Sequence, residues 1–262
     1  FRTMLASDPR FIVPRVLPEF STAHVICSTY EHGHSVSSQA VRDLPLERRS
    51  ALGKAALELF FRELFVWGEI QTDPNFGNYR IRIAGEEGDD PGFDRIVLLD
   101  FGAVQAYSDD FLKPVIQMIR ASYENDLQAV IDGGVKLRFM STEWPDEVLE
   151  KFGQVCMSVL EPLSSDKDAW PDYAVNSHGE YRWKQSELPS RVARQAARSA
   201  ISRYFRVPPK EFVFLNRKLI GVYTFVAVLN SEFNGEPLLR KYLYGEGDDA
   251  PDASATSQST KA

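Results

Sequence analysis

Three oxygen-bearing side chains stand out in this sequence because of their types and their spacing. Asp73 precedes Asn78 by five positions in the segment QTDPNFGN, and Asp100 opens the DFG triplet of LLDFG. Mg²⁺ prefers hard oxygen ligands and shares them with phosphate oxygens, so the Asp100 carboxylate and the Asn78 amide suit it. Asp73 would then face the reacting group and accept a proton from, or orient, an attacking hydroxyl or water. The pattern therefore predicts a magnesium-dependent phosphoryl-transfer site.

The residues between the two motifs predict a β-hairpin that brings Asn78 and Asp100 together. Apolar and basic side chains alternate over 79–83, as in a half-exposed strand, and the apolar run 96–99 follows as a buried strand. A Gly/Asp-rich turn, 85–92, joins them. Because the strands of a hairpin are antiparallel, its entrance and exit lie at the same end. The alternative is an ordinary surface hairpin whose acidic residues only form turns.

A helix is expected to lead into the first motif. Apolar residues recur at helical spacing over 45–67, and Gly68 follows where a helix often ends. Further upstream, 24–30 (HVICSTY) is a candidate strand, after which 31–33 would turn the chain away. A core helix and a short crossing segment would thus hold the motif from two sides.

Three segments resemble the C-terminal lobe of the UbiB/AarF family of atypical kinases. They read FIVPRVLPEFSTAHVICSTYEHG, FFRELFVWGEIQTDPNFGN and RIVLLDFGA. Many members of this family have HADPHPGN at the loop, and this chain keeps its aspartate, proline, glycine and asparagine at 73, 74, 77 and 78. The QTDPN form is most similar to the coenzyme-Q-associated branch. The similarity is strong over 11–121 and continues weakly to about 243.

The resemblance implies a fold, a cofactor pair and roles for single residues. The fold would be α+β and mainly helical: a protein-kinase-like C-terminal lobe whose short β-hairpin carries the metal-binding loop. Asp73 would be the catalytic-loop aspartate, and Asn78 and Asp100 the metal ligands of a site that uses ATP and Mg²⁺. The adenine would lie against the crossing segment, which nominates Ser28, Thr29, Tyr30 and Glu31 as nucleotide-contacting residues. Thr29 stands where the family commonly has a glutamate.

The N-terminal lobe of such a fold is expected to be largely absent from this sequence. The first glycine is Gly33 and the first lysine is Lys54, so no Gly-rich segment, K-x-G-Q segment or phosphate-contacting lysine precedes the nominated hinge. We therefore expect a fragment of a longer protein, weakly active or inactive by itself. Its expected parts are the end of the N-lobe with the hinge (1–34), a helical C-lobe (35–244) that holds catalytic loop 71–78 and DFG 100–102, and a disordered tail (245–262).

The region after DFG bears on the substrate. In protein kinases a long activation segment between DFG and A-P-E forms the platform for a peptide. Here Ser108 resembles a helix N-cap only six residues after Gly102, and A-P-E occurs nowhere in the chain. We therefore expect the phosphoryl acceptor to be water or a small or lipid-like molecule.

Composition excludes several classes of protein. The 262 residues are 44% hydrophobic but contain no run of 18 apolar residues, so no transmembrane segment is expected. The net charge of −7 argues against a nucleic-acid partner, which requires a basic face. The two cysteines, Cys27 and Cys156, lie in apolar contexts far apart and are interpreted as reduced core residues.

The second half of the sequence is expected to be helical. The predicted helices cover 126–131, closed by Gly133 and Gly134, and then 145–160, 188–204 and 210–230. The third carries four arginines, which indicates either a basic face for a membrane surface or a partner, or simply a solvated face: Arg191, Arg194, Arg198 and Arg203.

Three functions fit these patterns. The leading one is a Mg²⁺-dependent ATPase or atypical kinase that supports ubiquinone biosynthesis or related lipid metabolism. Lipids, quinone-biosynthesis proteins and a membrane surface are its expected partners, and the bacterial cytoplasm or the mitochondrial matrix its expected location. The second is a nucleotide-regulated binding module without turnover. The third is a small-molecule phosphotransferase of the aminoglycoside or choline kinase type, which also uses a D-x-x-x-x-N loop but is disfavoured by the DFG string.

Overall fold

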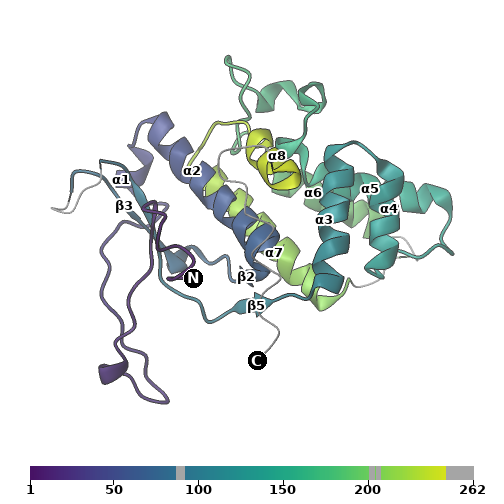
Figure 1. Ribbon diagram of the computed structural model, residues 1–262. Helices are drawn as coiled ribbons and strands as arrows, with labels where there is room; N and C mark the ends of the chain where they lie inside the picture. Colours follow the sequence, from purple (N-terminus) through teal and green to yellow (C-terminus); the bar gives the residue numbers. More distant parts are fainter. Residues whose placement is uncertain (87–91, 201–203, 205–207, 246–262) are drawn as a thin grey trace.

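The computed structural model describes residues 1–86, 92–200, 204 and 208–245 (Figure 1). It is a mixed α+β structure with more helix than strand, as the sequence predicts. The strands are β1 (Phe11–Ile12), β2 (Glu69–Gln71), β3 (Tyr79–Arg82), β4 (Arg95–Leu98) and β5 (Val104–Ala106). The α-helices are α1 (Gln39–Arg42), α2 (Leu46–Phe61), α3 (Asp109–Tyr123), α4 (Leu127–Lys136), α5 (Asp146–Ser158), α6 (Leu188–Ala200), α7 (Lys210–Val228) and α8 (Glu236–Tyr244). Single turns of other helix types are η1 (Pro18–Phe20), η3 (Phe76–Asn78), η4 (Glu161–Leu163), η5 (Lys167–Ala169) and η6 (Asp172–Ala174), and η2 (Arg62–Trp67) is a π-helical segment.

Two small sheets hold the motif-bearing loops. In the first, with strand order β1-β4-β3, the antiparallel pair β3–β4 sets Tyr79 opposite Leu98 and Arg82 opposite Arg95. This is the predicted hairpin, and β1 adds to it in parallel. In the second sheet β2 pairs antiparallel with β5, so the strand before the Asp73 loop is bonded to the strand after DFG.

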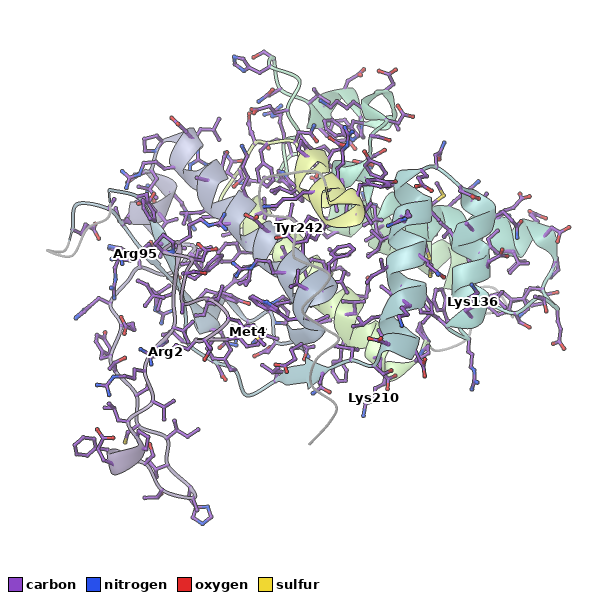
Figure 2. The ribbon with its side chains drawn as sticks, viewed as in Figure 1. Arg2, Met4, Arg95, Lys136, Lys210 and Tyr242 are labelled. Atoms are coloured by element: carbon purple, nitrogen blue, oxygen red, sulfur yellow. The ribbon has the colours of Figure 1, made fainter. Side chains whose placement is uncertain are left out.

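Helices α2 and α7 pack together through the middle of the molecule (Figure 1). The small sheets lie on one side of this pair and α3 to α6 on the other. Side chains of α2 serve both sides: Leu52 and Leu59 join a cluster with the β3–β4 sheet, whereas Leu57 and Phe61 join the larger helical core. Each such fully buried side chain contributes about 1.5–3 kcal/mol by leaving water. Figure 2 shows Lys210 at the start of α7 and Tyr242 of α8 near the centre, where its ring stacks on Phe65.

The helix expected over 45–67 is confirmed. Helix α2 passes directly into η2, and Gly68, with φ of 64°, closes the run in the left-handed region that favours glycine. Helices α5 and α7 match the predictions for 145–160 and 210–230 within a few residues. Both cysteines are free, as expected, and both are partly buried rather than fully buried.

The prediction that Gly133 and Gly134 close a helix was wrong. Helix α4 runs through both to Lys136, and neither has a positive φ. They serve packing instead: a Cβ added at Gly133 would lie 2.1 Å from the Met118 Cγ atom, and one at Gly134 would lie 2.7 Å from the Met140 sulfur. Glycine here lets two methionines approach the helix backbone.

The prediction of a strand over 24–30 was also wrong. Only Ser28 makes a β-bridge, with Val16, and Thr29 bonds through its backbone N–H to the Arg15 carbonyl. The segment is the returning arm of a long excursion that projects from the body at the purple end of the chain (Figure 1). Ile26, at 80% exposure, shows why periodicity misled: this apolar run has no sheet to bury it.

Helix α6 changes the interpretation of the arginine-rich segment. Arg191 binds both oxygens of Glu161, one at 2.8 Å, and donates from Nε to the Ser186 carbonyl. Arg191 thus belongs to a structural ion pair and is not a free surface cation. Arg194 is exposed. The side chain of Arg198, as well as Arg203 and the tail 246–262, lie outside the described residues, whereas Gly245 closes α8 with a φ of 69°.

Candidate functional site

The β3–β4 hairpin brings Asn78 and Asp100 to one small cleft. Both residues line it, together with Gln71 and, from the helices, Glu63 and Lys218. The hairpin is closed at this end by a bond of 2.9 Å from the Leu99 backbone N–H to the Asn78 carbonyl. The antiparallel register therefore places the two predicted metal ligands side by side.

Asp73 joins them through Asn78. The Asn78 Nδ2 atom donates to Asp73 Oδ2 over 2.9 Å. The turn between them is built by Asn75, whose side-chain oxygen accepts from the Gly77 N–H and whose carbonyl accepts from the Asn78 N–H. This local bonding explains why the five-residue spacing returns the chain onto Asp73.

The second sheet ties the two motifs to each other. Thr72 donates twice to the Ala103 carbonyl, from its backbone N–H at 3.0 Å and from its hydroxyl at 2.8 Å. Asp100 is exposed, and its Oδ1 accepts from the Gly102 N–H over 2.7 Å. These bonds hold the loop before Asp73 against the DFG turn.

Helix α7 supplies two cations that the sequence interpretation missed. Arg217 binds Asp73 Oδ1 through Nη2 at 3.0 Å, and Lys218 lines the cleft. Gly221, one turn further along α7, lets the helix approach the loop, because a Cβ there would lie 2.0 Å from the Cβ of Pro74. The basic pair Arg217–Lys218 in the middle of a helix that is otherwise apolar almost all round was the signal that could have revealed both residues.

Lys218 and Glu63 form a fully buried ion pair at the back of the cleft. The Lys218 Nζ lies 2.9 and 3.2 Å from the two Glu63 carboxylate oxygens. Burial raises the pKa of Glu63. Burial alone would lower the pKa of Lys218, but the facing Glu63 carboxylate and Tyr79 hydroxyl outweigh it and raise that pKa. The ammonium therefore stays charged beside the cleft.

The nominated hinge residues lie apart from this cleft. Tyr30 is 81% exposed, and Ser28 lies on the projecting arm. Glu31 accepts from Thr29 Oγ1 and from Arg82 Nη2, at the end of β3 opposite to Asn78. Among the described residues that line the cleft, none comes from 28–31.

The residues of the cleft fit a Mg²⁺ ion shared with phosphate. With Nδ2 engaged by Asp73, Asn78 keeps its carbonyl oxygen for a cation, and the Asp100 carboxylate is exposed beside it. Gln71 Oε1 is buried without a hydrogen-bond partner among the described residues, as expected where a ligand completes the site. Nowhere in the described ranges do three His, Cys, Asp or Glu side chains gather as a metal cage. A phosphate-bridged ion does not need one.

Comparison with known proteins identifies the class. The family model described as the ABC1 atypical kinase-like domain matches residues 1–133, half of the sequence. A solved structure of Rv3197 from Mycobacterium tuberculosis, determined with erythromycin, shares the fold with a TM-score of 0.57 at 16% identity, over 92% of this chain and 55% of that one. The fold is thus that of the atypical kinases.

The chain belongs to the ABC1 atypical kinase-like family, which confirms the resemblance drawn from its motifs. It is 26% identical over 251 residues to the atypical kinase coq-8, mitochondrial, of Caenorhabditis elegans, covering 94% of this chain and 31% of that protein. It is 27% identical over 232 residues to the atypical kinase COQ8B, mitochondrial, of Rattus norvegicus, covering 88% and 39%. The chain thus spans about a third of the length of these curated relatives.

Proposed function

We propose that this chain is the metal-holding and catalytic part of a Mg²⁺-dependent atypical kinase or ATPase of the UbiB/AarF type. The observation that carries the proposal is the cluster of Asp73, Asn78 and Asp100, joined by a direct bond and a shared cleft. In this proposal the chain is a kinase-like C-terminal lobe (35–244) preceded by the end of the N-lobe and a hinge at Ser28–Glu31. The position of 28–31 outside the cleft makes the hinge its weaker element.

The chain's own residues would divide the chemistry as follows. When bound, Mg²⁺ would neutralise charge on the phosphate groups. Asn78 and Asp100 would hold it, and the Asn78–Asp73 bond would keep the proposed base beside the ion site. Asp73 would accept the proton of the attacking hydroxyl or water with the oxygen that Arg217 now occupies. Lys218, paired with Glu63, would keep a positive charge in the cleft that Asp100 lines.

The wider role follows from the relatives. Two of them are named as mitochondrial COQ8-type kinases, which supports a role in ubiquinone biosynthesis or related lipid metabolism, in mitochondria or on the cytoplasmic side of a bacterial membrane. No helix of the described residues is long and apolar enough to cross a bilayer. Lipids, a membrane surface and quinone-biosynthesis proteins are the partners that this role would involve.

A second candidate is a nucleotide-regulated module without turnover. The contact that favours it is the Arg217–Asp73 ion pair, because the guanidinium occupies one oxygen of the proposed base at 3.0 Å until the arginine leaves. In that case binding, rather than hydrolysis, would be the function of the site.

The two candidates separate in the natural full-length protein. Mg-ATP binding is measured by calorimetry and phosphate release by a coupled assay, for the wild type, Asp73→Asn and Asp100→Asn. The enzyme proposal expects Asp100→Asn to lose binding and Asp73→Asn to bind but release phosphate at least ~100-fold more slowly. Binding without turnover in the wild type would favour the regulated module. If wild type and Asp100→Asn bind Mg-ATP equally, the proposed site is wrong.

A further inference from the structure

A second cavity lies behind the candidate site, on the other side of α7. It has a volume of about 350 Å³, is open at one side and is lined by residues of α2, α3, α5, α6, α7 and α8. Its lining is almost entirely apolar and includes Phe60, Met118, Phe152 and Leu219. No charged side chain contributes among the described lining residues.

An apolar cavity of this size is unusual in a protein interior that binds no ligand there. Interiors are normally packed as densely as organic crystals, with few voids larger than a water molecule. Water enters a cavity stably only where polar groups can bond it, and the polar side chains of the described lining are Ser122, Asn216 and the Cys156 thiol. Burial raises the pKa of that thiol to about 12, in keeping with apolar surroundings. The volume falls within the range of known small-molecule pockets, about 300–1,000 Å³.

The form of the cavity favours a small molecule over a protein partner. A protein-docking face presents large apolar side chains to solvent, yet among the described residues no exposed large apolar side chain belongs to the lining. The lining comes instead from the inward faces of helices, as in ligand sites between the helices of bundles. An extended ligand could be surrounded there along most of its length.

We propose that this cavity binds a small, mainly hydrocarbon molecule that carries one neutral polar group. The hydrocarbon part would lie against Phe60, Met118, Phe152 and Leu219, and the polar group would bond to Ser122 or Asn216. The described lining offers no charged side chain, so the proposal concerns a ligand whose part inside the cavity is uncharged. The proposal does not depend on nucleotide binding at the other side of α7.

The test uses the natural full-length protein and the fluorescent probe N-phenyl-1-naphthylamine, with dodecanol as competitor. We expect saturable binding of one probe per chain, displaced by dodecanol. Cys156→Trp would fill the cavity and weaken probe binding at least ~10-fold, since the added ring takes the volume that the probe needs. The matched control is Gln154→Trp, on the exposed side of the same helix, which should bind like the wild type.

Each outcome decides the proposal. Circular dichroism and thermal melting confirm that the variants fold, and Ser122→Phe, which enters the cavity from α3, replaces Cys156→Trp if that variant does not. Absence of saturable probe binding by the wild type would overturn the proposal. So would equal binding by Cys156→Trp and Gln154→Trp, which would place the probe elsewhere, for instance on a surface covered by a protein partner.

Discussion

One side of α7 makes polar contacts with the candidate site, and the other side lines an apolar cavity. Toward the β3–β4 hairpin the helix presents Arg217 and Lys218, each held at hydrogen-bonding distance by a carboxylate, and Gly221, pressed against Pro74. Toward α3 and α5 it presents Leu215 and Leu219 to a cavity without described charges. A single helix thus separates a polar site, whose geometry is fixed by ion pairs, from an apolar cavity, into which neighbouring side chains can move.

The largest expected effect is the loss of the buried lysine. Lys218→Met would leave the Glu63 carboxylate, 1% exposed, without its partner, and removal of one member of a buried pair costs about 3–5 kcal/mol. Urea unfolding of the natural full-length protein measures this loss. The control Lys113→Met removes an exposed lysine paired with Asp109 and should lose no more than about 1 kcal/mol.

The double variant Lys218→Met/Glu63→Gln sharpens the argument. Because it removes the uncompensated charge as well, it should recover a large part of the stability that the single variant loses. A double variant as unstable as Lys218→Met alone would mean that packing, and not charge, makes Lys218 important.

A smaller contrast is expected between two helix glycines. Gly221→Ala sets a methyl group 2.0 Å from Pro74, whose ring cannot turn away, whereas Gly133→Ala meets the flexible Met118 at the cavity edge. We expect Gly221→Ala to lose about 1–3 kcal/mol, as overpacked sites do, and to weaken Mg-ATP binding. Gly133→Ala should lose less than Gly221→Ala, since Met118 has to turn to clear the new methyl group but can swing toward the cavity, and alanine favours the helix by up to about 1 kcal/mol. Equal losses for both would contradict the difference in rigidity between the two sides.

The smallest effect concerns Cys156. Burial raises its pKa to about 12 from an ordinary value of 9.0, so its thiol stays protonated at pH 9 in the folded state. In a Cys27→Ser background, iodoacetamide should therefore alkylate Cys156 at least ~100-fold more slowly at pH 9 than in urea.

The sign of the stability effect at Cys156 follows from the same shift. The pKa of Cys156 is higher in the folded than in the unfolded state. Its contribution to the stability of the fold is therefore fully present below pH 9 and is lost as the pH rises toward 12. If iodoacetamide alkylated Cys156 as fast in the folded chain as in urea, the thiol would not have the apolar surroundings that raise its pKa.

The sequence predicted what depends on neighbours along the chain. Alternation over 79–83 gave β3, helical spacing gave α2, and the D-x-x-x-x-N spacing placed Asp73 beside Asn78, because a single turn capped by Asn75 makes that contact. The strand over 24–30 failed because an apolar run does not reveal whether a sheet is present to bury it.

Contacts between distant segments were not predictable in this way. Lys218 reaches Glu63 across 155 positions and Arg217 reaches Asp73 across 144. Helix α8 and the β2–β5 pair were likewise missed, since short elements depend on tertiary packing for their stability. The cavity has no sequence signature, because its lining residues resemble those of any packed core.

The most direct test of the polar side measures the metal itself. Mn²⁺ replaces Mg²⁺, and electron paramagnetic resonance counts bound Mn²⁺ in the natural full-length protein with a non-hydrolysable ATP analogue. The account predicts one tightly bound ion in the wild type and in Asp109→Asn, an exposed acidic control at the start of α3. In Asp100→Asn the affinity should fall at least ~10-fold, because the ion loses a charged ligand. Undiminished Mn²⁺ binding by Asp100→Asn would contradict the assignment of this cleft as the nucleotide-metal site.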